Sequence, residues 1–522
     1  MGATGVSGCS GQQSAAVGVG EMHPYRDLPR GEDAGLAPRV AAGPWLDLAA
    51  ACDICSANWL GPDDIAARAA VRLDQLLESA RTRTAFYRRL HAASASPMAG
   101  ANVPRDAAAR IRARLSALPA VQRSALMASF DDTVADAALD RASVERFIAS
   151  PSRLGTRLGP AGAVWTSSGT TGEPGVYLHD DAALAVYDAL QLYRFRGCNS
   201  PLEAGLRLST DGPYALVAAT GGHFAGAASL ARLQRRQPWL ADRLHCISLM
   251  QPLPRIVAAL QACGPRLLAT YPSAAAVLAD EQQAGRLRLS LEELWLGGER
   301  LGDGLRARLA RVFGARVRQE YGASEFPSIA ADCARGRLHL NADWALLEAV
   351  DAQGRPVEPG VSSASALLTN LANRLQPLIR YDLGDAVRID PSRCACGSPL
   401  PVVEVQGRSD DTLRFDAPDG AVVSLLPLVL ATILEEQAGV YGFQLAAVGA
   451  DAIALRLAPP EHAAAERARA ALRAHLDAMA LAPVRVLWDG EEPRRSRRSA
   501  KLQRVVDERA AQAAVRDEPR AG

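Results

Sequence analysis

The stretch ELWLGGERLGDGLRARLARVFGARVRQEYGASE (residues 293–325) contains two short apolar runs separated by a segment long enough for an amphipathic helix. The first run, Glu293–Leu296, ends in Gly297-Gly298-Glu299, and the second, Ala315–Glu320, ends in Tyr321-Gly322-Ala323-Ser324-Glu325. A strand, a helix and a strand in this order predict parallel neighbours in one sheet. Ligands bind beyond the carboxyl ends of such strands, so we expect both clusters to border one site.

The same alternation extends toward the N-terminus. Apolar runs at Leu244–Met250 and Arg266–Thr270 are separated by further amphipathic segments, and the second run leads into Tyr271-Pro272-Ser273. Helical spacing from Asp63 to His91 predicts an earlier helix that is capped by Asp63 or Asp64. We therefore predict an α/β fold, with doubly wound parallel sheets in a large N-terminal domain.

The sequence changes character after about residue 408. A charged turn, Arg408-Ser409-Asp410-Asp411, leads into short apolar runs, a long Ala/Arg-rich segment and a basic tail. The predicted elements are strands at 440–447 and 452–457, a helix at 461–480 and a strand at Val484–Trp488. They predict a small α+β lid domain hinged at 408–411. The predicted organisation is a flexible leader at 1–45, a main domain at 46–407 and the small domain at 408–522.

Composition narrows the class of protein. The chain has 522 residues and a net charge of +1, so it offers no excess of positive charge for nucleic acid or an anionic membrane. It contains no run of about 18 uncharged apolar residues and no signal-peptide pattern. Nine cysteines without an export signal indicate reduced thiols. We expect a cytoplasmic protein that binds neither nucleic acid nor membrane.

A run of hydroxyl and glycine residues, Ser167-Ser168-Gly169-Thr170-Thr171-Gly172, follows a short apolar stretch. Backbone N–H groups and hydroxyls in such a loop can wrap phosphate oxygens. The run is not a Walker loop, because it lacks the lysine and the spacing of that motif. Taken alone, it fits a polar surface turn equally well.

Five segments in register resemble the adenylate-forming superfamily, which contains acyl-CoA synthetases, luciferases and peptide-synthetase adenylation domains. They are residues 167–172, 321–325, 380–385 and 407–411 and the segment around Lys501, and their order and spacing agree over residues 60–506. Within the superfamily the chain most resembles the phenylacetate-CoA ligase group. The features of that group are Arg72–Tyr87, Leu118-Pro119, Tyr271-Pro272-Ser273, Gly297-Gly298-Glu299 and Gly407-Arg408-Ser409-Asp410-Asp411.

The resemblance implies a role for each motif. Ser324 is expected to contact the α-phosphate of ATP. The β- and γ-phosphates are expected to contact the hydroxyl loop, which consists of Ser167, Ser168, Gly169, Thr170, Thr171 and Gly172. Glu325 is expected to bind Mg²⁺, which offsets phosphate charge. The remaining nucleotide contacts are Gly298 and Glu299 along the adenine, Tyr321 and Gly322 beside them, Asp385 on the ribose hydroxyls and Arg408 on ribose or phosphate.

Lys501 is the only lysine among 58 basic residues. A lysine presents a compact point charge, whereas an arginine presents a broad planar fork. Taken alone, a single lysine on a solvated basic tail needs no functional explanation and fits retention by chance. The resemblance implies instead that Lys501 bridges the substrate carboxylate and the α-phosphate.

Four further residues suit a metal. Cys333, His339, Cys394 and Cys396 supply three thiolates and an imidazole, the donor set of a closed tetrahedral zinc site, although four unlinked loop residues are the alternative. Cys52 and Cys55 lie on a predicted helix, where their spacing fits chance better than a redox pair. His223 either lines an acid pocket or packs against the sheet.

The predicted enzyme uses ATP and Mg²⁺ to convert a small, aromatic or other, carboxylic acid to an acyl-adenylate. It then passes the acyl group to a thiol, most simply coenzyme A. One alternative acceptor is the phosphopantetheine of an acyl carrier protein, because residues 412–427 lack the Gly-x-Asn-type loop of true phenylacetate-CoA ligases. The other alternative is a nucleotide-binding regulatory protein without catalysis. The sequence is compatible with a homodimer.

Overall fold

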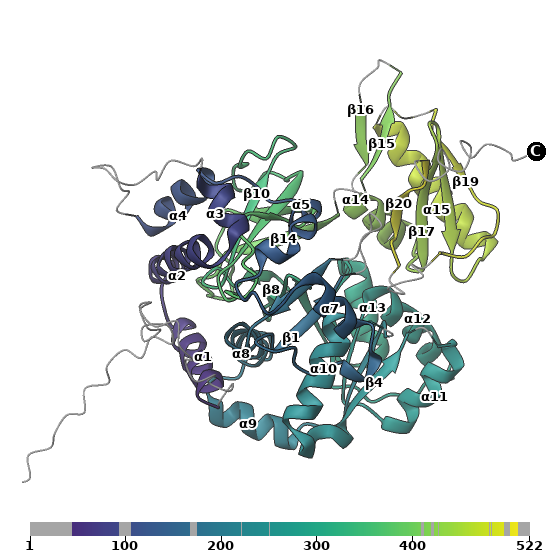
Figure 1. Ribbon diagram of the computed structural model, residues 1–522. Coiled ribbons are helices and arrows are strands. Elements are labelled where there is room, and N and C mark those ends of the chain that lie inside the picture. Colours follow the sequence, from purple (N-terminus) through teal and green to yellow (C-terminus); the bar gives the residue numbers. More distant parts are fainter. Residues whose placement is uncertain are drawn as a thin grey trace, which may run out of the picture.

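The computed structural model describes residues 44–92, 106–167, 175–220, 222–249, 251–408, 412–418, 422–425, 427–479, 481, 483–494 and 502–509. A nine-stranded sheet lies at the centre of the larger, N-terminal part, and the C-terminal part, yellow in Figure 1, stands beside it with a smaller sheet of its own. The predicted α/β fold with a small α+β C-terminal lid is confirmed.

The central sheet has the strand order β13-β14-β9-β8-β7-β6-β5-β3-β4. Its parallel half consists of β3 (Tyr214–Ala218), β4 (Leu244–Ser248), β5 (Leu267–Thr270), β6 (Glu293–Leu296) and β7 (Arg316–Ala323). Four of these strands, β4 to β7, confirm the alternation predicted between residues 244 and 320. The other half is antiparallel and was not predicted: β8 (Phe326–Asp332), β9 (Leu338–Leu340), β13 (Asp385–Asp390) and β14 (Val402–Arg408).

The chain reverses between the two halves at a close backbone approach. A Cβ atom on Gly322 would lie 1.8 Å from the carbonyl oxygen of Pro327, so β7 and β8 can meet there only at a glycine. The two strands pair in antiparallel fashion from Glu320 to Ala331. Residues 324 and 325 therefore lie at the tip of a tight turn.

Residues of the parallel strands alternate between two environments, as strand geometry requires. One set packs against α11 (Leu253–Cys263), α12 (Pro272–Gln283) and α13 (Asp303–Phe313) in a hydrophobic cluster with Ala215, Val217, Leu268, Leu294 and Val317. The other set faces α8 (Asp181–Leu190), the π-helical turn η2 (Gln191–Phe195) and α10 (Ala225–Arg236), and includes Tyr214, Leu216, Ala218, Ala269 and Trp295. The second face encloses a cavity.

The predicted helix from Asp63 to His91 is two helices, α2 (Pro62–Arg83) and α3 (Ala85–Ala92). Thr84 has an extended backbone and ends α2, with its hydroxyl donating to the carbonyl of Ala80 at 2.7 Å. Gly61 is the N-cap and Pro62 takes the first helical position, so the prediction of Asp63 or Asp64 as the cap was wrong. Both aspartates lie in the first turn of α2, where their negative charges interact favourably with the positive end of the helix dipole.

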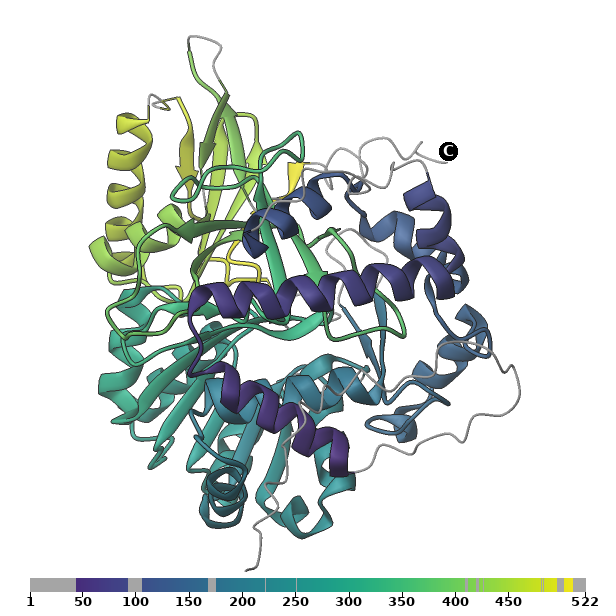
Figure 2. The ribbon, with the colours of Figure 1, turned by 90° about the vertical axis from the view of Figure 1, so that its left-hand side faces the viewer.

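Figure 2 shows α1 (Pro44–Ala57) and α2 in purple, crossing the face of the N-terminal part. The other elements of this part are short. They are α4 (Ala107–Ser116), α5 (Arg123–Ala128), α6 (Phe130–Thr133), α7 (Arg141–Ile148), η1 (Pro151–Arg153), β1 (Ala163–Thr166), β2 (Val176–His179), α9 (Pro201–Thr210), η3 (Pro238–Arg243), β10 (Ala345–Val350), β11 (Ser365–Asn370) and β12 (Tyr381–Asp382).

The C-terminal part has a separate hydrophobic core within residues 413–505. Its elements are β15 (Leu413–Asp416), β16 (Val422–Leu425), α14 (Pro427–Thr432), the π-helical turn η5 (Ile433–Gln437), β17 (Phe443–Gly449), β18 (Ala452–Leu457), α15 (His462–Ala478), β19 (Arg485–Leu487) and β20 (Val505–Asp507). The predicted strands and helix of this region are confirmed to within three residues, whereas β15, β16 and β20 were not predicted. Within the described residues, no helix is both long and apolar enough to cross a membrane.

Candidate active site

A cavity of about 950 Å³ lies at the carboxyl ends of β3, β5, β6 and β7. Its lining brings together motifs that are far apart in the sequence: Ser167, Glu299, Glu325, Asp385 and Leu502–Val505. The first four belong to the N-terminal part and the last segment to the C-terminal part. The cavity is therefore closed by both.

Ser167 stands at the neck of the hydroxyl loop, between β1 and β2. Its N–H donates to the carbonyl of Gly175 at 2.9 Å, and the N–H of Gly175 donates to its Oγ at 3.1 Å. These two bonds extend the antiparallel pairing of β1 and β2, in which Thr166 and Val176 are the register pair next to the loop. The loop residues Ser168, Gly169, Thr170, Thr171 and Gly172 lie outside the described residues, so only Ser167 is placed, and it lines the cavity.

The turn that carries Ser324 and Glu325 is held by buried side chains. His179 Nε2 lies 3.0 Å from the carbonyl oxygen of Ser324, and Asn370 Nδ2 donates to the carbonyl of Glu325 at 2.9 Å. Burial lowers the pKa of His179 to about 3, so its imidazole is neutral, and Nε2 carries the proton because a carbonyl only accepts. Ser324 Oγ donates to the carbonyl of Thr166 at 3.2 Å, which ties the turn to the hydroxyl loop.

Three residues beside Glu325 were not among the predicted site residues. The hydroxyls of Tyr177 and Tyr381 are 2.8 Å apart, and Arg123 Nε donates to the Tyr381 hydroxyl at 3.3 Å. Burial opposes the charge of Arg123, but Tyr381, Tyr177 and Glu325 outweigh it and raise the pKa of this arginine. A fixed cation therefore stands beside the carboxylate of Glu325, which is itself buried.

Two backbone hydrogen bonds between Val121 and the distant motif at 380–385 bring Arg123 to this place. The N–H of Val121 donates to the carbonyl of Arg380 at 2.9 Å, and the N–H of Asp382 donates to the carbonyl of Val121 at the same distance. The motif at 380–385 was identified from sequence, so Tyr381 carried a signal. Nothing near residue 123 indicated that it would pair with this motif.

Two of the sequence motifs meet directly. The Tyr321 hydroxyl donates to Asp385 Oδ2 at 2.7 Å. Asp385 is also the register partner of Arg408 at the start of β13 and the end of β14. The structure thus brings the motifs at 321–325 and 380–385 together with Gly407 and the backbone of Arg408 at one end of these strands, whereas residues 409–411 lie outside the described residues.

Glu299 joins the two parts of the protein. It follows Gly298, whose φ of +76° lies in the left-handed region that favours glycine. Its carboxylate accepts from the N–H of Ser273 at 2.9 Å, from the Ser273 hydroxyl at 3.0 Å and from the N–H of Leu502 at 3.1 Å. Lys501 lies outside the described residues, but the residue that follows it is anchored at the cavity by this bond.

The four residues of the predicted metal site converge away from the cavity. The ligand atoms of Cys333, His339, Cys394 and Cys396 all lie within 4.8 Å of one another, and none of these residues lines the cavity. Nδ1 of His339 lies 2.9 Å from the carbonyl oxygen of Leu400, so it carries the proton and leaves Nε2, 3.3 Å from Cys396 Sγ, free to bind a metal. This orientation and donor set fit a tetrahedral zinc ion.

The other residues considered from sequence have no part in the cavity. His223 is buried and packs its ring against Phe147 at 5.2 Å between centroids, whereas the next residue, Phe224, lines the cavity. His223 therefore takes the packing role of its two alternatives. Cys52 and Cys55 lie on α1 as free thiols.

The sequence matches no protein-family model and no curated protein. The fold, by contrast, is similar to that of 2-hydroxyisobutyryl-CoA ligase. Its postadenylation state in complex with R3-HIB-AMP has a TM-score of 0.62 and 19% identity, covering 92% of this chain and 95% of that chain. Its thioesterification state in complex with 2-HIB-AMP and CoA has a TM-score of 0.50 and 20% identity over the same shares.

These likenesses confirm the predicted fold, which the chain shares with 2-hydroxyisobutyryl-CoA ligase. The narrower resemblance to the phenylacetate-CoA ligase group stays a prediction. For one and the same ligase, the score is higher in the postadenylation state than in the thioesterification state.

Proposed function

We propose that the protein is an AMP-forming acid–thiol ligase. In the first step, a carboxylate oxygen of the substrate attacks the α-phosphorus of ATP, which forms an acyl-adenylate and releases pyrophosphate. In the second step, a thiolate attacks the acyl carbon, a thioester forms and AMP leaves. Coenzyme A is the simplest thiol, and a small or aromatic carboxylic acid is the proposed substrate.

The observation that carries this proposal is the convergence of the motifs on one cavity. Ser167, Glu299, Glu325 and Asp385 come from four separate segments, and Leu502, the residue after Lys501, lies at the same place. A regulatory protein that only binds a nucleotide would not need Glu325 for a metal, Asp385 for the ribose and Lys501 for the transition state together. Their joint presence favours catalysis.

The proposed roles follow from the chemistry of each side chain. Asp385, oriented by Tyr321, accepts hydrogen bonds from the ribose hydroxyls. Glu325 holds Mg²⁺, which when bound would offset the charge of the phosphates. Arg123 adds a fixed positive charge at the same place. Lys501 stabilises the charge that gathers between carboxylate and α-phosphate.

We also propose that Cys333, His339, Cys394 and Cys396 hold a structural zinc ion. A structural site uses all four positions for protein ligands, and the four ligand atoms here are within reach of one ion. Such a site would connect the turn after β8 to the loop between β13 and β14.

The test is pyrophosphate release from ATP, Mg²⁺ and a panel of carboxylic acids, followed by thioester formation with coenzyme A or with holo acyl carrier proteins. We expect at least one acid to release pyrophosphate in the absence of any thiol. The acceptor that gives a thioester decides between coenzyme A and a carrier protein. Failure of every acid, with nucleotide binding retained, would favour the regulatory alternative.

A further inference from the structure

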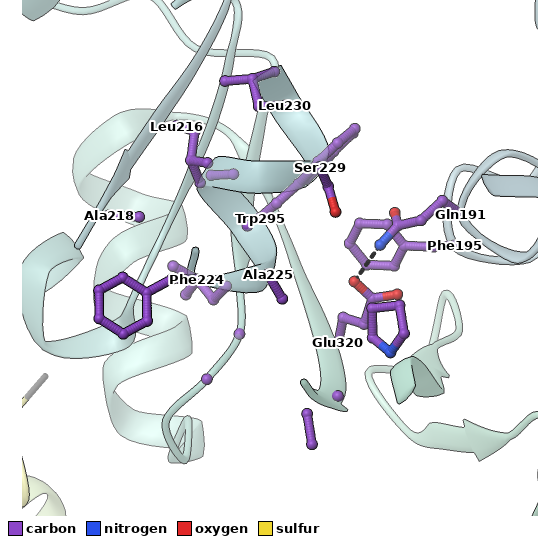
Figure 3. Close-up of a pocket in the computed structure, with 18 of the residues that line it drawn as sticks. Gln191, Phe195, Leu216, Ala218, Phe224, Ala225, Ser229, Leu230, Trp295 and Glu320 are labelled. Atoms are coloured by element: carbon purple, nitrogen blue, oxygen red, sulfur yellow. Dashed lines mark hydrogen bonds between the residues drawn. The ribbon is translucent and has the colours of Figure 1, made fainter. Parts of the chain in front are cut away.

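Part of the cavity wall beneath α10 is apolar. Figure 3 shows Leu216, Ala218 and Trp295 on the sheet, with Phe224 and Ala225 at the start of α10 facing them. A T-shaped contact at 5.2 Å between ring centroids joins Trp295 to Phe195 of η2. Such a wall suits the hydrocarbon part of a small acid.

One carboxylate interrupts this wall. Glu320 lines the cavity next to Phe195, and Gln191 Nε2 donates to its Oε2 (Figure 3). The other oxygen, Oε1, is buried and meets no donor in full hydrogen-bond geometry, although the Ser328 side chain is close enough to lower the pKa of this carboxyl. A carboxylate can accept roughly four hydrogen bonds, so the protein fills only part of the capacity of Glu320.

Among the residues that the structure describes, no cationic side chain forms an ion pair with Glu320. The nearby Arg318 is bound to Asp332, with Nε 2.8 Å from Oδ1. Burial raises the pKa of Glu320 to about 7, with smaller opposing effects from Ser328 and Gln191. Glutamine or leucine would fit this place in the sheet without that cost, which points to a use for the carboxylate.

Glu320 also lies apart from the nucleotide contacts. It precedes Tyr321 on the same strand, so the two side chains point to opposite faces, and Tyr321 turns to Asp385. Glu320 turns instead toward η2, where Gln191 and Phe195 lie. A molecule that meets Glu320 therefore occupies the apolar side of the cavity.

We propose that the acid activated by this enzyme carries an amino or hydroxyl group that donates a hydrogen bond to Glu320. Gln191 positions the carboxylate, and Trp295 and Phe195 surround the hydrocarbon part. This inference rests on the proposed function, because it assigns the apolar side of the cavity to the acid. Glu320 is then the residue that distinguishes a donor-bearing acid from its unsubstituted analogue.

The experiment compares matched acids in the full-length protein. Benzoic acid, the three aminobenzoic acids and the three hydroxybenzoic acids are assayed for pyrophosphate release, together with propionic, 3-aminopropionic and 3-hydroxypropionic acid. For at least one donor-bearing acid we expect kcat/KM to exceed that of its unsubstituted analogue by roughly 10- to 100-fold, the range for a buried hydrogen-bonding group. Comparison of the amino-substituted acids with the hydroxy-substituted acids identifies the group that donates the hydrogen bond.

Variants test whether Glu320 is responsible. Glu320→Leu should remove the preference or reverse it. Glu320→Gln should lose more with 3-aminopropionic acid, whose amine is charged, than with 3-hydroxypropionic acid, because it removes the negative charge. Glu292→Gln, an exposed change outside the cavity, should keep the wild-type preference. Melting temperatures identify any variant that fails to fold, and Gln191→Leu provides a second, milder perturbation of the same group.

Two results would overturn the inference: equal use of substituted and unsubstituted acids by the wild type, or an unchanged preference in a folded Glu320→Leu variant. If no acid releases pyrophosphate, the proposed function fails separately. Calorimetric binding of the same acids to the wild type and to Glu320→Leu then decides the inference, since only a preference that depends on Glu320 supports it.

Discussion

The bond between Glu299 and Leu502 predicts that removing one carboxylate will slow only the first half-reaction. Glu299→Ala removes three accepted hydrogen bonds, two from Ser273 and one from the N–H of Leu502. The last bond holds the residue after Lys501 at the cavity. Its loss frees the lysine segment without touching the acid or the thiol.

The size of the effect follows from the bond. A hydrogen bond to a charged group contributes roughly 1.5–3 kcal/mol net, and the partial exposure of Glu299 favours the lower end. Each 1.4 kcal/mol is about tenfold in rate, so pyrophosphate release should fall by about 10-fold. Thioester formation from a preformed acyl-adenylate should be unchanged, because that step does not need the contact.

Ser273→Ala is the matched control. It removes one bond to Glu299 and leaves the contact with Leu502 in place, so any loss of stability should appear without the loss of rate. The assays are ATP–pyrophosphate exchange, single-turnover thioester formation and thermal melting. Wild-type exchange in a folded Glu299→Ala variant would refute the reasoning, as would an equal fall in both half-reactions.

Three further predictions concern Lys501, the metal cluster and the hinge. Lys501→Ala should reduce acyl-adenylate formation by about 10²–10³-fold at an unchanged melting temperature, and Lys501→Arg should also be poor because its fork is wider; wild-type exchange in either variant would contradict the role. Elemental analysis of chelator-washed protein should find one zinc per chain, lost in a variant that combines Cys394→Ser and Cys396→Ser; zinc that persists there would exclude the cluster. Asp410→Pro should keep pyrophosphate release and slow thioester formation, since a fixed φ restricts the swing between steps; normal thioester formation would show that the pivot lies elsewhere.

The parallel half of the sheet could be predicted because its information is local. Strands there are short apolar runs, such as Glu293–Leu296, and all but β7 are followed by a helix, so both patterns can be read within about 30 residues. The antiparallel half depends on pairings between distant segments, such as Val402 with His339. The close contact of Gly322 with Pro327, which reverses the direction, is a property of the folded backbone.

The same distinction applies to the site. The residues found from sequence, such as Glu325 and Asp385, belong to contiguous motifs with characteristic spacing. Arg123 and Gln191 enter the site from helical segments without any motif, and only the tertiary structure places them beside Tyr381 and Glu320. Glu320 did carry a signal, because it is a charged residue at the end of a buried strand, but its partner could not be identified from the sequence.

The proposed zinc site and the nucleotide site lie at opposite ends of the same strands. β8 starts directly after Glu325 and ends before Cys333, β13 starts at Asp385 and runs toward Cys394, and β14 returns from the cysteine loop to end at Arg408. Strands of six or seven residues span roughly 20 Å, so the metal cannot take part in the chemistry. What a zinc ion would do is hold three strand ends in register, and that register positions Glu325, Asp385 and the start of the predicted hinge. Loss of zinc should therefore weaken folding and the alignment of the nucleotide contacts together, whereas loss of Lys501 should affect the chemistry alone.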